Sequence, residues 1–175
     1  MGSHDIRIVG RTGRARTLGL LLVLAACSGS VRATGLEVQT AEEQAVIDAA
    51  QAVFDAMEAR DPDAFRASMT PEGFFMAVGF ETTQRTTRDE FASRLADAPQ
   101  PMYERMWDPE VRIDGPVATL WTAYDFYRGM EFSHCGTDAI QLAKTPDGWK
   151  ITAASYTVRM PPDCSTHPDG PPGGN

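Results

Sequence analysis

Residues 131–159 read EFSHCGTDAIQLAKTPDGWKITAASYTVR, and this stretch decides the fold. Two runs of strand-forming residues, 140–144 and 149–158, flank a segment with strong turn chemistry. In that segment Pro146 presets φ, and Gly148 accepts a left-handed backbone conformation. The stretch therefore predicts a hairpin of two long antiparallel strands.

The turn also sets which residues of the hairpin face each other. With a three-residue loop at 146–148, Asp138 lies opposite Tyr156 and Ile140 lies opposite Ala154. Directly opposed side chains share one face of a sheet. These two pairs are therefore expected on the same face.

The rest of the chain supplies helices first and strands afterwards. Apolar spacing and capping residues predict helices at 40–60, 61–69 and 87–96, with one short strand at 74–80. Four longer strands then follow as a meander, at 102–113, 117–127, 131–144 and 149–160. This order predicts an α+β fold with three N-terminal helices on one face of a curved, mainly antiparallel sheet. Residues 40–160 form that domain.

The N-terminus has the pattern of a signal peptide over residues 1–26. A basic segment precedes LGLLLVLAA at 18–26, an apolar run too short to span a bilayer. The sequence Leu24-Ala25-Ala26-Cys27 resembles the bacterial lipobox, in which the cysteine is diacylated and becomes the mature N-terminus. Lipidation is therefore expected at Cys27, followed by a flexible tether over 27–39. The alternative is a plain secretory signal with Cys27 incidental.

The charge of the mature chain limits its partners. Removal of residues 1–26 leaves 12 basic and 23 acidic side chains, a net charge of −11. Such a surface repels nucleic acid and anionic membranes. Membrane attachment is then expected only through the lipid on Cys27, with the protein on the periplasmic side of a bacterial cell envelope or secreted.

Export also affects the two remaining cysteines. In an oxidising compartment Cys135 and Cys164 are expected to form a disulfide, and two unpaired thiols are the alternative. The tail at 161–175 is rich in proline and glycine, and it is expected to be irregular and, beyond Cys164, disordered. No metal site or cofactor is expected, because the sequence has no zinc pattern, no phosphate loop and no G-x-S-x-G motif.

Several segments carry a family resemblance. RDPDAF at 60–65, VRIDGPVA at 111–118 and DGWKI at 147–151 resemble the nuclear transport factor 2-like superfamily. Within it, His134-Cys135-Gly136 with Asp138, Gln141-Leu142 and Tyr156-Thr157 resembles the group labelled SnoaL-like or putative lumazine-binding. The resemblance implies a cone-shaped fold that hosts isomerases, dehydratases, cyclases and non-catalytic binding modules. It supplies no catalytic set that can be matched residue by residue.

Strand alternation gives a hypothesis for a pocket. If each strand pairs with the next through short turns, one face mixes apolar walls with a few polar groups, as small-molecule pockets do. That face comprises Tyr103, Arg105, Trp107, Leu120, Thr122, Tyr124, Phe126, His134, Asp138, Ile140, Tyr156 and Val158. The residues predicted to bind a small hydrophobic or aromatic ligand are Tyr103, Trp107, Tyr124, His134, Asp138 and Tyr156.

The same face contains the candidate catalytic residues Asp138, His134, Tyr124 and Tyr156. His134 and Asp138 lie four residues apart on one strand, roughly 13 Å, and cannot bond directly. Asp138 with a raised pKa could act as a general base, with Tyr124 as the donor to an oxyanion. Alternatively, His134 and Asp138 hold a bulge near Gly136, or they orient a ligand without turnover.

The opposite face is predicted to be apolar enough to need a partner. It carries Trp121, Ala123, Tyr127, Thr137, Ala139, Ile151 and Ala153. A homodimer through this face is expected, and a monomer with a sparsely hydrophobic face is the alternative. Taken together, the sequence favours an exported, lipid-anchored module that binds a small molecule or a protein. The alternative is a general acid/base enzyme of isomerase, dehydratase or cyclase type.

Overall fold

The computed structural model describes residues 39–79 and 81–173. The predicted signal peptide, Cys27 and nearly all of the predicted tether lie outside the described residues. Among the helices that are described, none is long and apolar enough to cross a membrane.

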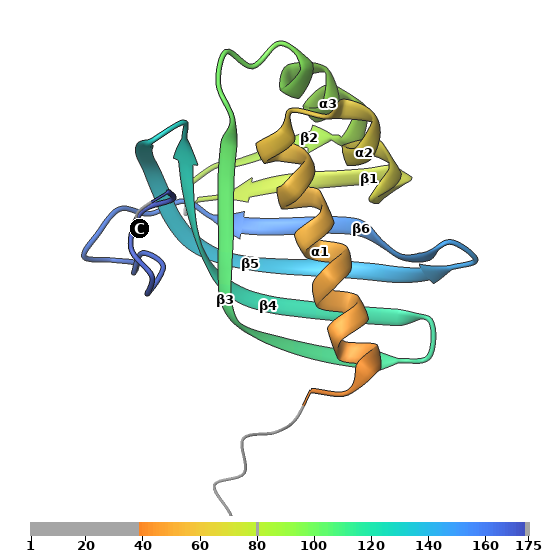
Figure 1. Cartoon of the computed structure of the whole chain (residues 1–175). Coiled ribbons are helices and arrows are strands. Elements are labelled where there is room, and N and C mark those ends of the chain that lie inside the picture. Colours follow the sequence, from red (N-terminus) through yellow and green to blue (C-terminus); the bar gives the residue numbers. More distant parts are fainter. Residues whose placement is uncertain (1–38, 80, 174–175) are drawn as a thin grey trace, which may run out of the picture. The chain divides into compact units, whose positions relative to one another are not determined.

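Helix α1 (Ala41–Ala59) begins with a capping box. The Thr40 hydroxyl accepts a hydrogen bond from the Glu43 N–H at 3.2 Å, and the Glu43 carboxylate accepts one from the Thr40 N–H at 2.7 Å. The helix ends at Arg60, which has a left-handed φ of 54°. Figure 1 shows α1 crossing one face of the sheet.

Two shorter helices complete the helical layer. α2 (Pro62–Ala67) is capped by Asp61, and α3 (Arg88–Ala96) is capped by Thr87. Both lie over β1 and β2 at one end of the sheet (Figure 1). All three predicted helices are confirmed.

The sheet has six strands in the order β2-β1-β6-β5-β4-β3. Neighbouring strands are antiparallel except β1 and β6, which are parallel. The predicted meander of the four last strands is confirmed, whereas β2 is a strand that the sequence pattern did not predict. The bounds are β1 (Met69–Val78), β2 (Thr83–Thr87), β3 (Met102–Asp114), β4 (Val117–Arg128), β5 (Glu131–Thr145) and β6 (Gly148–Thr157).

The hairpin of β5 and β6 has the predicted register at its inner end. Asp138 pairs with Tyr156, and Ile140 pairs with Ala154. The turn has only two residues, one fewer than predicted. One extra residue in β6, inserted opposite the step from Gln141 to Leu142 in β5, restores the register. This bulge also turns Ile151 into the core, so the prediction that Ile151 lies on the outer face was wrong.

The sequence prediction of short turns would place Tyr124 opposite His134, and the observed pairing of β4 with β5 differs from this by two residues. Tyr124 lies opposite Gly136, and His134 lies opposite Phe126 instead of Tyr124. A shift of two keeps every side chain on its face. Tyr124 and His134 therefore still share the inner face, and their rings meet edge to face at 5.7 Å.

Strand β3 is where the predicted face was wrong. Its register with β4 shifts between Trp107 and Glu110, and Asp108 within this bulge has a φ of 51°. One extra residue reverses the faces of the part of β3 before the bulge. Tyr103 and Trp107 consequently lie on the outer face, and Arg105 pairs there with Asp125.

The C-terminal tail packs against this outer face. The predicted disulfide joins Cys135 to Cys164, with a Cα–Cα distance of 5.8 Å. Beyond it, the His167 N–H donates to the Asp125 carboxylate at 2.8 Å, and Arg105 donates to the Gly170 carbonyl at 2.6 Å. The tail is irregular, and its bonds at His167 and Gly170 hold it against the sheet, so the expectation of disorder directly beyond Cys164 was wrong.

Candidate functional site

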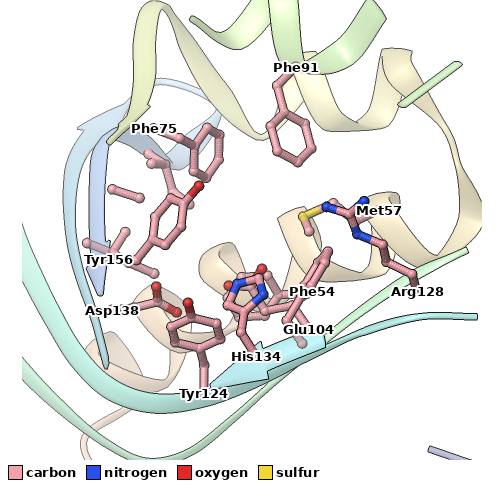
Figure 2. A pocket seen from close by; sticks show the side chains of 14 residues that line it. Phe54, Met57, Phe75, Phe91, Glu104, Tyr124, Arg128, His134, Asp138 and Tyr156 are labelled. Atoms are coloured by element: carbon pink, nitrogen blue, oxygen red, sulfur yellow. The ribbon is translucent and has the colours of Figure 1, made fainter. Parts of the chain in front are cut away.

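A cavity of about 110 Å³ lies on the inner face of the sheet, beside α1. Aromatic and aliphatic side chains form most of its wall, and a few polar groups converge on it, as is usual for a ligand site. Figure 2 shows Phe75 and Phe91 on one side and Phe54 of α1 on another. The lining residues are Phe54, Met57, Phe75, Phe91, Glu104, Tyr124, Phe126, Arg128, His134, Asp138, Ile140, Ile151, Ala154 and Tyr156.

Two carboxyl groups meet inside this cavity. The side chains of Glu104 in β3 and Asp138 in β5 lie next to each other, and each shifts the pKa of the other. Burial raises the pKa of Asp138 to about 7, while the neighbouring Glu104 side chain acts in the opposite direction. Burial, with the nearby Asp138 charge, raises the pKa of Glu104 well above its usual range. Two carboxyl groups this close in a buried site cannot both ionise cheaply, so the pair retains a proton at a pH at which exposed carboxyl groups have lost theirs.

One oxygen of this pair has no partner. Asp138 is only 3% exposed, and among the described residues nothing hydrogen-bonds its buried Oδ2 atom. An unpaired buried acceptor destabilises the fold by about 1–3 kcal/mol. Such an atom on the wall of a cavity is suited to accept a hydrogen bond from a bound molecule.

Two tyrosines flank the pair in different ways. The Tyr124 hydroxyl donates to the Thr157 carbonyl at 2.8 Å, so its proton is already engaged. The hydroxyl of Tyr156, opposite Asp138 in the sheet, makes no hydrogen bond within the described part of the chain. Burial raises the pKa of both phenols, which are therefore neutral donors. Tyr156, rather than the predicted Tyr124, can donate to a ligand.

His134 is a neutral side chain in this site. Its Nδ1 lies 3.0 Å from the Ser133 hydroxyl, and its ring packs against Phe126 at 5.0 Å. Burial first, and then the positive charge of Arg128, lower its pKa. The imidazole contributes shape and polarity to the wall and carries no charge at neutral pH.

The structure brings four of the six predicted ligand-binding residues together at this cavity: Tyr124, His134, Asp138 and Tyr156. Tyr103 and Trp107 are excluded from it by the bulge in β3, and Trp107 instead packs against His167 of the tail at 5.5 Å. Val158, also predicted on this face, follows the end of β6 and is exposed.

Because of the same bulge, the strand pattern did not place Glu104 on the inner face. A proline inside a strand is usually found at an edge or a bulge, and Pro109 follows Asp108 in the middle of β3. This dipeptide was the available signal that the face changes there. Among the described residues, no group of three or more His, Cys, Asp or Glu side chains is arranged to hold a metal.

Comparison with known proteins places the chain by family and fold. Residues 41–157 match the family described as "Putative lumazine-binding". No curated protein sequence matches the chain. An NTF2-like protein from Cytophaga hutchinsonii has a similar structure, with a TM-score of 0.59 and 11% identity over 68% of this chain and 99% of that chain.

Two further solved structures carry names that suggest chemistry. One is described as a "putative aromatic ring hydroxylase" from Novosphingobium aromaticivorans, with a TM-score of 0.57 and 20% identity over 69% of this chain and 90% of that one. The other is a "putative dehydratase" of the NTF2-like family from Streptomyces avermitilis, with a TM-score of 0.56 and 18% identity over 67% and 95%. At such identities they show the fold alone, and they confirm the predicted nuclear transport factor 2-like class.

Proposed function

Because the chain belongs to the putative lumazine-binding family, we propose that it binds a small organic ligand in the cavity beside α1. The observation that carries the proposal is the unpartnered, buried Oδ2 of Asp138. A ligand hydroxyl or N–H would satisfy this atom and remove the penalty of leaving it unpaired. The ring-lined walls would supply the apolar part of the affinity.

The size of the cavity limits the ligand. An apolar cavity of about 150 Å³ accommodates one benzene ring, and this cavity is of similar order at about 110 Å³. The site therefore suits a single ring or a short chain with one hydrogen-bond donor at its inner end. Binding without turnover needs nothing further from the protein.

Mass spectrometry of ligands retained by the purified protein tests this proposal. The wild type is expected to carry a small compound that Asp138→Asn loses, because the amide no longer offers the same acceptor. Asp147→Asn, at the exposed turn between β5 and β6, is the matched control and should retain it. An identical ligand profile in Asp138→Asn and wild type would remove Asp138 from the site.

A second function, general acid/base catalysis, is favoured by one specific observation. Asp138 has a pKa of about 7, where a carboxylate is an effective general base at neutral pH. In this reaction Asp138 would take a proton from a carbon next to a carbonyl, and Tyr156 would donate to the oxygen that gains the charge. No catalysis is needed to explain the cavity, so binding remains the first proposal.

Proton exchange separates these two functions. Cyclohexanone incubated with the protein in D₂O should gain deuterium next to its carbonyl if Asp138 acts as a base, and the gain should disappear in Asp138→Asn. Exchange at the rate of buffer alone would count against an enzyme of this kind.

Export and lipid attachment are proposed from the sequence pattern of residues 1–27. Lipid on Cys27 would hold the domain at the cell envelope, because a chain with a net negative charge is repelled by anionic membranes. Growth with a radioactive fatty acid should label the wild type but not Cys27→Ser. A wild type that is secreted without label would favour the plain secretory signal.

A homodimer through the outer face of the sheet is also proposed. Trp121 is 58% exposed there, beside an apolar groove that includes Val78, Ala139 and Val158. The tail covers only part of this face, around Asp125. Sedimentation should show a dimer that Trp121→Glu dissociates, and a wild-type monomer at all concentrations would refute it.

A further inference from the structure

The two ends of the cavity carry side chains of opposite charge type, acidic at one end and basic at the other. Figure 2 shows Asp138 and Tyr156 on one side and Arg128 on the opposite side, next to Met57. Arg128 is the only side chain with a permanent positive charge among the described residues that line the cavity. Arg128 is exposed, whereas Asp138 is buried and Glu104 is half-buried.

Arg128 has no fixed partner among the residues that the structure describes. Within residues 39–79 and 81–173, its side chain forms no ion pair and no hydrogen bond. Glu131 is its neighbour across the turn from β4 to β5, but the two charges do not pair. The charge does act on the site, because it contributes to the lowered pKa of His134.

From this arrangement we infer that the ligand is a single-ring compound with a hydrogen-bond donor at its inner end and an anionic group at its outer end. The donor bonds Oδ2 of Asp138, and the anionic group pairs with Arg128. The inference rests on the proposed function and specifies its ligand class. The anionic group is a carboxylate, phosphate or sulfonate, all of which a guanidinium binds.

The size of the cavity supports this orientation. A ring fills a space of about 110 Å³, so a substituent on its far side must lie at the mouth, where Arg128 is. The reverse orientation would bring the anionic group beside two carboxyl groups in a buried site, which is strongly unfavourable. In a chain with a net charge of −8, one unpaired arginine at a cavity mouth is a local attraction for an anion.

Three matched probes test the inference: 4-hydroxybenzoate, its neutral analogue 4-hydroxybenzamide, and benzoate, which lacks the inner donor. Their dissociation constants are measured by calorimetry at pH 7.5. The wild type should bind 4-hydroxybenzoate about fivefold more tightly than the amide, as expected for an exposed ion pair. Benzoate should bind more weakly than 4-hydroxybenzoate, and the carboxylate preference should shrink as salt is added.

Two substitutions test whether Arg128 is responsible for the preference for the carboxylate. Arg128→Gln should bind 4-hydroxybenzoate and the amide equally well, while Arg112→Gln, an exposed arginine on the outer face of β3, should keep the wild-type preference. Equal binding of acid and amide by the wild type, or a preference that survives in Arg128→Gln, would overturn the inference. Both outcomes leave the proposed function intact if Asp138→Asn still weakens every probe that has a hydroxyl. Failure of all three probes to bind would overturn the inference and count against the cavity as a ligand site.

Discussion

The carboxyl groups of Glu104 and Asp138 lie next to each other in the cavity, although their strands, β3 and β5, are separated by β4. The bulge in β3 turns Glu104 to the inner face, and the pairing of β5 with β6 puts Asp138 beside Tyr156. Two acids in one buried site cannot both ionise cheaply. The pair therefore holds a proton at a pH at which exposed carboxyl groups have lost theirs.

The first prediction is that this pair makes the free energy of unfolding fall as the pH rises. Below about pH 4 both the folded and the unfolded chains hold these protons. As the pH rises, the unfolded chain releases them, while the folded chain keeps the Asp138 proton until about pH 7. The free energy of unfolding of wild type, minus that of Asp138→Asn, should therefore fall by roughly 2–4 kcal/mol between pH 4 and pH 8.

Urea denaturation at a series of pH values measures this difference. Glu104→Gln should show a trend of the same sign, because it also removes one member of the pair. A difference that is flat, or that rises with pH, would show that the two carboxyl groups do not share a proton in the folded protein.

The second prediction concerns the buried ion pair on the outer face. Asp125 is fully buried, and Arg105 donates to it twice, at 3.0 and 2.6 Å. Arg105→Gln would leave a buried carboxylate without its counter-charge and should lower the free energy of unfolding by about 3–5 kcal/mol. Arg112→Gln, an exposed arginine of the same strand, should change it by about 0.5 kcal/mol or less.

The double variant Arg105→Met/Asp125→Leu distinguishes charge from packing. Replacing both members removes the unpaired charge, so its stability should recover most of the loss. A double variant as unstable as Arg105→Gln would indicate that the bonds to the tail, rather than the ion pair, stabilise this region.

The third prediction concerns the disulfide between Cys135 and Cys164. The two cysteines are 29 residues apart in sequence, and the bond constrains the unfolded chain. Replacing both by serine should lower the free energy of unfolding by about 3–4 kcal/mol. Hydrogen exchange at His167, whose N–H bonds Asp125, should also become faster. Wild type treated with a reductant should match the variant, and unchanged exchange at His167 would show that the tail binds without the disulfide.

The helices and the register of β5 with β6 could be predicted because their signals are local. Capping residues mark the helix starts, and proline and glycine mark the turn. Even so, the correct pairing of Asp138 with Tyr156 arose from two compensating differences. The turn is one residue shorter than predicted, and the bulge in β6 adds one residue.

The acid pair could not be predicted with the same method. Alternation predicts which face a side chain lies on only as long as no residue is inserted in the strand. The bulge at Asp108 and Pro109 inserts one residue. Everything before it in β3 then changes face, so Glu104 replaces Arg105 in the cavity. The lining from α1 and α3, including Phe54 and Phe91, depends on how helices pack on the sheet, which a strand pattern does not contain.

The last prediction concerns Gly136, the residue opposite Tyr124. A Cβ atom at this position would collide with the Thr157 carbonyl oxygen and lie 2.8 Å from the Tyr124 ring. That carbonyl also accepts the Tyr124 hydroxyl bond, so Gly136→Ala must move the end of β6 and the wall of the cavity together. It should lower the free energy of unfolding by about 2–4 kcal/mol, whereas Tyr124→Phe, which removes only the hydrogen bond, should cost about 0.5–1.5 kcal/mol. Because backbone of β6 must shift, Gly136→Ala should also weaken binding of 4-hydroxybenzoate more than Tyr124→Phe does. Equal effects of the two substitutions on stability would mean that this part of the sheet adjusts to a methyl group, and that the close approach of β5 and β6 does not hold the cavity in shape.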